Sequence, residues 1–153
     1  MKFLRYRAPD GPAYGLVDSD GQVAAMRGSP FDHPEPGESV GPIASLQLLP
    51  PLLPSAIICV GMNYADHVAE SKAAMPEFPL YFMKPSTTLV GHGEAIVYPR
   101  DSTVVHYEAE LCVVIGRRGR RIPEAEALQY VLGYTCANDV SARDWQRKEM
   151  AQV

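Results

Sequence analysis

The sequence predicts an α+β fold that is rich in strands and has few, short helices. Most of its apolar runs are short and are bounded by Gly, Pro, Asn or Asp. Runs of this kind are typical of strands, whereas helices need longer stretches with a period near 3.6 residues. The 14 prolines and 12 glycines among 153 residues place frequent turns between the runs. These observations favour a β-rich roll over a doubly wound sheet.

Composition and charge exclude several classes of protein. The net charge is −4 and 46% of the residues are hydrophobic, as in an ordinary globular chain. The short basic group at residues 117–121 is interrupted by Gly119, and we expect it to be an exposed turn and not a nucleic-acid surface. No apolar stretch approaches the roughly 20 residues that span a bilayer. The N-terminus has no long apolar segment of a secretory signal. We therefore expect a cytoplasmic protein with no nucleic-acid or membrane partner.

The cysteines point away from a disulfide framework and from zinc. Cys59, Cys112 and Cys136 are odd in number and show no C-x-x-C spacing. Each lies within an apolar run, so we expect buried, unreactive thiols.

Residues 1–54 are predicted to be a small β domain followed by a linker. Short strands are expected at residues 2–7, 13–17 and 22–26, and Asp20-Gly21 is a hairpin turn signal between the last two. Residues 28–54 are rich in proline, and an extended linker on the surface is expected there.

Residues 55–153 are predicted to be a second domain. A buried strand is expected at residues 56–60, followed by a helix at 64–74 that Asn63 caps and Pro76 ends. Further strands are expected at residues 80–83, 95–98, 106–115 and 131–138. Short helices are expected at residues 123–130 and 141–150.

Two glutamates in the strand at 106–115 are candidate metal ligands. Glu108 and Glu110 are two residues apart, so in a strand both point to the same face. Like charges side by side on an apolar strand repel each other, and a hard cation such as Mg²⁺ offsets that repulsion. The alternative is that both carboxylates face water on an edge strand.

A second acidic position follows the strand at 131–138. Asp139 lies where that strand turns into a helix, and Arg143 and Gln146 share a face of the helix because they are three residues apart. The acid suits a metal, and the planar guanidinium suits a substrate carboxylate. The alternative is that Asp139 is only a helix cap and Arg143 a surface residue.

A histidine and a glutamate form the third candidate group. His67 and Glu70 are three residues apart on the helix at 64–74, directly after a strand and a glycine turn. A carboxylate beside an imidazole orients the ring, so the pair is a candidate general base.

Taken together, these segments resemble the fumarylacetoacetate hydrolase family. The blocks that carry the resemblance cover most of residues 56–147, and residues 1–50 resemble, more weakly, a small N-terminal domain of many bacterial members. The matching residues are Val60-Gly61-Met62-Asn63-Tyr64 with His67 and Glu70; Phe82-Met83-Lys84-Pro85; Tyr107-Glu108-Ala109-Glu110-Leu111 with Val114-Ile115-Gly116; Gly133-Tyr134; and Asn138-Asp139-Val140-Ser141-Ala142-Arg143-Asp144 with Gln146.

The resemblance implies a fold and an extent for the chain. It implies a mixed β-sandwich roll with short helices, preceded by a small β domain. Residues 55–153 then correspond to the N-terminal half of the catalytic domain, and the chain is expected to be truncated. We also expect a homodimer.

The resemblance also implies a site. Glu108, Glu110 and Asp139 would hold Mg²⁺ or Mn²⁺, and Arg143 and Gln146 would contact a small 2-oxo or β-diketo carboxylate. His67, oriented by Glu70, would be the catalytic base.

The implied activity is hydrolysis of a C–C bond or isomerisation, for example of the 2-hydroxyhepta-2,4-diene-1,7-dioate type in aromatic degradation. Decarboxylation of an oxaloacetate-like acid at the same site is an alternative. A non-catalytic binding protein or inactive fragment of the same fold is another. The sequence does not choose among these reactions, or between Mg²⁺ and Mn²⁺.

Overall fold

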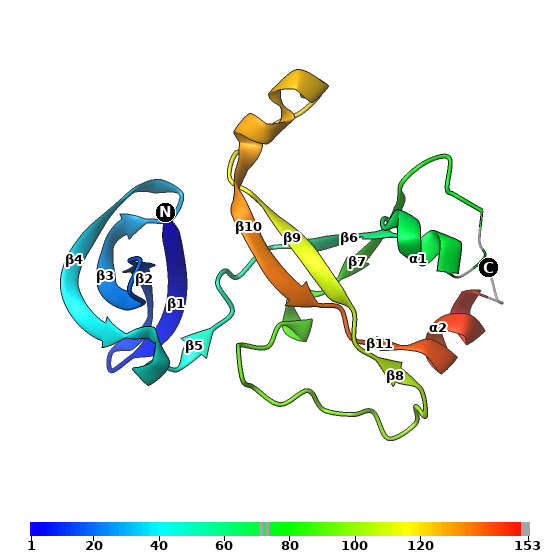
Figure 1. Ribbon diagram of the computed structural model, residues 1–153, viewed down its shortest axis with the longest axis horizontal. Coiled ribbons are helices and arrows are strands. Elements are labelled where there is room, and N and C mark those ends of the chain that lie inside the picture. Colours follow the sequence, from blue (N-terminus) through cyan, green and yellow to red (C-terminus); the bar gives the residue numbers. More distant parts are fainter. Residues whose placement is uncertain (71, 73, 151–153) are drawn as a thin grey trace. The chain divides into compact units, whose positions relative to one another are not determined.

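The computed structural model describes residues 1–70, 72 and 74–150, which divide into two compact units (Figure 1). The first comprises residues 1–30 and 34–95, and the second residues 31–33 and 96–153. Strands account for 44% of the structure and helices for 17%, which confirms the strand-rich prediction.

The first unit begins with a five-stranded sheet in the order β4-β3-β2-β1-β5 (Figure 1). β1 pairs with β2 along its whole length, from Lys2 opposite Val17 to Ala8 opposite Gly11. At the turn into β3, the Asp18 carboxylate accepts the backbone N–H groups of Asp20 and Gln22, each at 2.9 Å. The three strands expected here are confirmed. The strands of this sheet are β1 (Lys2–Ala8), β2 (Gly11–Val17), β3 (Gln22–Ser29), β4 (Asp32–Pro42) and β5 (Leu48–Leu49).

A small core lies on this sheet. Leu4, Tyr6 and Val23 are buried, and apolar residues of β1, β2, β4 and β5 pack against them. Gly15 faces Leu4 across the sheet, and a Cβ at this glycine would lie only 2.5 Å from the Val23 side chain. The close packing of the core therefore requires glycine at this position.

The linker expected at residues 28–54 is wrong. This stretch supplies β4, a 3-10 helix at Ile43–Ser45, and β5, which pairs with β1 at Arg5 and Tyr6. β4 is an edge strand, where a proline without an N–H group is tolerated. The prolines therefore mark the sheet edge and not a linker.

A two-stranded ribbon follows within the first unit. β6 (Ile57–Gly61) pairs antiparallel with β7 (Leu80–Lys84), with Cys59 opposite Phe82. The expected burial of the first strand is wrong, because the ribbon has only two strands and the Ile58 side chain is 64% exposed.

The helix between these strands is shorter than expected. α1 (Ala65–Glu70) buries Val68, and Ser71 and Ala73, within the expected helix, lie outside the described residues. A 3-10 helix at Ser86–Thr88 follows β7.

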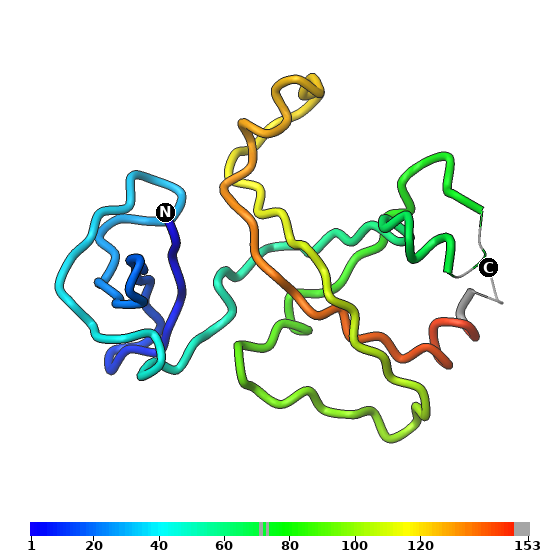
Figure 2. Tube along the Cα trace, in the orientation of Figure 1, coloured from blue at the N-terminus to red at the C-terminus, as the bar shows by residue number. Residues whose placement is uncertain are grey.

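Residues 89–104 contain neither helix nor strand (Figure 2). The strand expected at 95–98 is therefore wrong. Its apolar residues have no neighbouring strand, and the Val97 side chain is 87% exposed.

The second unit is built on the twisted ribbon of β9 (Ala109–Ile115) and β10 (Val131–Asn138), joined through a 3-10 helix at Glu124–Tyr130 (Figure 1). A shorter pair, β8 (Val105–His106) with β11 (Ser141–Ala142), leads into α2 (Arg143–Met150). Two boundaries differ from the prediction. The strand expected at 106–115 is interrupted at Tyr107 and Glu108, and the helix expected from residue 141 begins at Arg143, because Ser141 and Ala142 pair with β8.

Three further expectations concern exposure. The arginines of residues 117–121 are exposed, as expected for a turn. Cys59 and Cys112 are half-buried, but Cys136 is exposed, so the expected burial is wrong for that thiol. Within the described part of the chain, no helix combines the length and the apolar character needed to span a membrane.

Candidate metal and substrate site

The backbones of two predicted metal ligands, Glu108 and Asp139, are bonded to each other where the β9–β10 ribbon ends. The backbone N–H of Asp139 donates to the carbonyl of Glu108 at 2.9 Å. The N–H of Glu108 in turn donates to Oδ1 of Asn138 at 3.0 Å. These bonds continue the pairing of Asn138 with Ala109 one step beyond the strands. Glu108 and Asp139 are thereby neighbours, although 31 positions apart in sequence.

The third predicted ligand, Glu110, lies within β9 opposite Ala137. Burial raises the pKa of the Cys112 thiol, and the negative charges of Glu110 and Asp139, together with Cys136, raise it further. Both carboxylates therefore lie within electrostatic reach of one thiol. A raised thiol pKa disfavours the reactive thiolate, in line with the unreactive thiol expected from the sequence.

Arg143 joins the acidic group from the start of α2. Its Nη2 donates to Oε1 of Glu108, and its Nη1 donates to Oε1 of Gln146 at 2.9 Å. The side chains of Arg143 and Glu108 are only 17% and 24% exposed. The second oxygen of Glu108 accepts a hydrogen bond from the Ser141 hydroxyl at 3.4 Å. The predicted shared face of Arg143 and Gln146 is confirmed.

Asp144, to which the sequence assigned no role, anchors the start of this helix. The Asp144 carboxylate accepts the Ser102 hydroxyl at 2.7 Å and the Thr103 backbone N–H at 2.9 Å. Chiefly the bond from the Thr103 N–H, helped by that from Ser102, lowers the pKa of Asp144 from 3.8 to about 2. The indole N–H of Trp145 donates to the Asp101 carbonyl at 3.0 Å. These partners are more than 40 residues away, so no local pattern marks this role of Asp144; the signals in the sequence are its place in a block that carries the family resemblance and in a first helical turn.

His67 and Glu70 both lie on α1, in the first unit, and both are exposed. The other predicted site residues belong to the second unit. The arrangement of His67 as a base beside the acidic group stays a prediction.

The chemistry of the acidic group suits a hard cation, but its arrangement does not yet form a cage. Glu108, Glu110 and Asp139 offer only carboxylate oxygens, which Mg²⁺ and Mn²⁺ prefer, and Oδ1 of Asp139 is buried. Among the described residues, no three Asp, Glu, His or Cys side chains converge closely enough to hold a metal ion. One oxygen of Glu108 is instead bound to Arg143.

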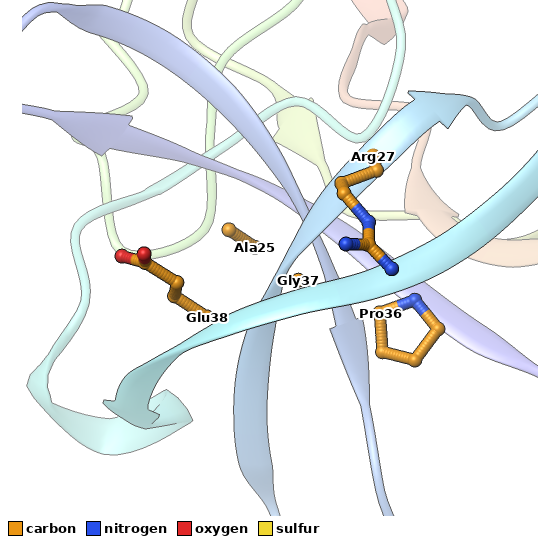
Figure 3. A pocket seen from close by; sticks show the side chains of 5 residues that line it. All are labelled: Ala25, Arg27, Pro36, Gly37 and Glu38. Atoms are coloured by element: carbon orange, nitrogen blue, oxygen red, sulfur yellow. The ribbon is translucent and has the colours of Figure 1, made fainter.

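Two hollows lie elsewhere, and neither is lined by a predicted site residue among those the structure describes. One lies along β3 and β4, where Arg27 and Glu38 project from neighbouring strands (Figure 3). It is lined by Ala25, Arg27, Pro36, Gly37 and Glu38. The other adjoins the start of α1, between residues 60–65 and 75–79.

Two solved structures resemble almost the whole length of this chain, and a curated protein resembles about two thirds of it. A 5-carboxymethyl-2-hydroxymuconate delta-isomerase from Mycobacterium smegmatis is 42% identical with a TM-score of 0.82, and the match covers 97% of this chain and 58% of that one. A 2-hydroxyhepta-2,4-diene-1,7-dioate isomerase from Mycobacterium marinum is 36% identical with a TM-score of 0.83, covering 97% and 57%. A mitochondrial oxaloacetate tautomerase fahd2 from Xenopus laevis is 46% identical over 107 residues, covering 69% of this chain and 34% of the relative.

Two family profiles match adjacent parts of the sequence. Residues 1–51 match the profile described as Rv2993c-like, N-terminal, and residues 56–153 match the C-terminal domain of fumarylacetoacetate (FAA) hydrolase. The chain spans little more than half of the two solved relatives, 58% and 57% of their lengths. The second profile covers well over half of the residues, and the relatives bear the names of enzymes. The chain belongs to the fumarylacetoacetate hydrolase family.

Proposed function

We propose that this chain contributes to a divalent-metal-dependent isomerase or hydrolase of small 2-oxo or β-diketo carboxylates. The observation that carries the proposal is the contact of Glu108 with Arg143 beside Asp139, which puts two kinds of binding group at one point. Carboxylates hold a hard cation, and a guanidinium holds a substrate carboxylate.

The predicted residues divide three tasks among them in this proposal: holding the cation, binding the substrate and moving a proton. Glu108, Glu110 and Asp139 would hold Mg²⁺ or Mn²⁺, and such an ion would supply Lewis-acid stabilisation of the charge that develops on a keto oxygen. Arg143 and Gln146 bind and orient the substrate carboxylate. His67 takes and returns a proton, with Glu70 orienting its ring.

The choice of reaction follows the similar proteins. Two solved relatives are named isomerases of unsaturated hydroxy acids with two or three carboxyl groups, which supports isomerisation of such an acid. The similarity to an oxaloacetate tautomerase supports a second candidate, proton transfer or decarboxylation on an oxaloacetate-like acid at the same residues. The turnover rates of the two kinds of substrate, measured with one preparation of the protein, distinguish the two candidate reactions.

Cellular context is part of the proposal. A cytoplasmic homodimer fits a catabolic enzyme for small acids, and sedimentation of the purified protein measures the assembly.

The first test is stabilisation of the protein by Mg²⁺. A ligand that binds the folded state at about 100 times its Kd stabilises that state by about 2.7 kcal/mol, which raises the melting temperature by several degrees. We expect this shift in the wild type and its loss in Glu110→Ala. Glu126→Ala is the matched control, because Glu126 is an exposed acid on the 3-10 helix of the same unit. Equal shifts in the wild type and Glu110→Ala would exclude the proposed metal site.

A further inference from the structure

The carboxylate of Glu108 has two competing uses. In the structure its Oε1 accepts from Arg143 and its Oε2 accepts from Ser141. In the proposed function the same carboxylate is one of three that hold a divalent cation. Arg143 likewise has two uses, since it pairs with Glu108 and is also the group that would bind the substrate carboxylate. While the two residues are paired, Glu108 is therefore less available to a cation and Arg143 is less available to a substrate carboxylate.

The surroundings of the Arg143–Glu108 pair make the competition for Glu108 strong enough to measure. Both side chains are mostly shielded, 17% and 24% exposed, so salt screens their attraction less than at an open surface. A divalent cation on Glu108 would lie close to the guanidinium, and the two positive charges would repel each other.

The backbone around Arg143 is fixed, so a change of partner falls on its side chain. The Arg143 N–H donates to the Val104 carbonyl at 2.8 Å, where β11 pairs with β8. Gln146, one turn along α2, already accepts from the other nitrogen of the guanidinium. Arg143 can thus leave Glu108 while Gln146 still orients it.

From this geometry we propose that Arg143 is a substrate ligand gated by the cation site. Arg143 pairs with Glu108 while the cation site is empty, and it becomes free for a substrate carboxylate when Glu108 turns to the cation. Binding is then ordered, with the cation first and the carboxylate second. The inference rests on the proposed function and adds a regulation to the same site.

The gate predicts that removing Arg143 strengthens cation binding. When a partner occupies Glu108, the apparent affinity for the cation is the intrinsic affinity multiplied by the fraction of Glu108 that stays free. We expect Arg143→Gln to bind Mn²⁺ about fivefold to tenfold more tightly than the wild type. The measurement is a Mn²⁺ titration in which the electron paramagnetic resonance signal reports the free ion.

A control variant tests whether the loss of any positive charge on α2 is enough to strengthen cation binding. Arg147→Gln removes the same charge from the same helix, at an exposed position one turn further on. Its Mn²⁺ affinity is expected to stay within about twofold of the wild type, because exposed charges are strongly screened. An equal gain in both variants, or no gain in Arg143→Gln, overturns the gate.

A second measurement uses the wild type and needs no folded variant. The Nε–Hε signal of Arg143, assigned through bonds by nuclear magnetic resonance, is expected to move when Mg²⁺ is added, while that of Arg147 stays in place. An unchanged Arg143 signal at a Mg²⁺ concentration that stabilises the protein overturns the gate.

Glu110→Gln distinguishes failure of the gate from failure of the proposed function. If wild-type Mn²⁺ binding is absent, or survives in Glu110→Gln, the cation site is wrong and the gate falls with it. If binding depends on Glu110 but Arg143→Gln leaves it unchanged, only the gate is wrong.

Discussion

At the scale of single residues, the proposed roles of ligand and base fall on different side chains. The carboxylates of Glu108, Glu110 and Asp139 would hold the cation, whereas His67 on α1 would move the proton. Because the roles are separate, substitution of the base should leave cation binding intact.

We therefore expect His67→Ala to lose turnover and to keep the stabilisation by Mg²⁺. Loss of a general base typically lowers the rate about 10²–10⁴-fold. The measurements are turnover of oxaloacetate and acylpyruvates and the Mg²⁺-dependent melting temperature. His92→Ala, at another exposed histidine, serves as the control. Full activity of His67→Ala on these substrates would refute the proposed base.

At the scale of elements, Asp144 joins α2 to a segment far away in sequence. Its carboxylate accepts from Ser102 and Thr103, and the neighbouring Trp145 bonds to Asp101. Ser102 is itself buried. These bonds fix the first turn of α2, which is the turn that carries Arg143.

This junction gives stability a pH dependence. Folding lowers the pKa of Asp144 from 3.8 to about 2, so the folded state favours the charged carboxylate. Its contribution is complete above about pH 4 and is lost as the pH falls towards 2. We expect Asp144→Ala to melt several degrees below the wild type at pH 7, with a difference that narrows between about pH 4 and pH 2. Asp10→Ala, at an exposed turn, is the control. A difference that stays constant down to pH 2 would contradict the lowered pKa.

The local sequence pattern correctly predicted the strands that consist of one short apolar run. The strands around Leu4, Val60, Leu111 and Thr135 follow from short apolar runs between turn formers, and all are present. The assignments that were wrong concern segments whose structure depends on pairing between residues distant in sequence. Within the expected linker, residues 32–42 and 48–49 become strands because β3 and β1 lie beside them, whereas residues 95–98 form no strand because no strand lies beside them. Strand pairing is set by tertiary context, which local propensity does not contain.

In the candidate site, too, the sequence predicted the local arrangement but not the contact between distant residues. The spacing of Arg143 and Gln146 placed both on one helical face, and their hydrogen bond agrees. The same-face argument for Glu108 and Glu110 assumed one continuous strand, whereas Glu108 precedes β9 at a break. Its bond to Arg143 spans 35 residues, and a contact over that separation has no signature in a local window.

At the scale of the whole molecule, the β9–β10 ribbon leaves apolar side chains uncovered. Alternation along β9 turns Glu110, Cys112 and Val114 to the more covered face. Leu111, Val113 and Ile115 point the other way and are 60%, 49% and 63% exposed. Tyr134, directly opposite Val113 on β10, is 59% exposed. A contiguous exposed apolar face of this kind is typical of a contact surface.

We expect the chain to bind a hydrophobic dye through this face and to associate with itself at high concentration. The double variant Val113→Thr, Ile115→Thr should reduce both dye fluorescence and sedimenting mass, because it makes the face polar and keeps strand-favouring residues. Val97→Thr with Leu128→Thr is the matched control, since these side chains are 87% and 75% exposed outside the ribbon. Equal reductions in the two double variants would show that the β9 face has no special role.

The five-stranded sheet differs from the β9–β10 ribbon in that prolines lie in or next to both of its border strands. One border strand, β4, contains Pro34 and Pro36, and the other, β5, is two residues long and runs directly into Pro50 and Pro51. A proline ring offers no amide hydrogen, so a foreign chain that docks alongside finds an interrupted ladder. Both border strands are therefore poor templates for templated growth, and the more open border is the part of β1 beyond Arg5 and Tyr6, the two residues with which β5 pairs.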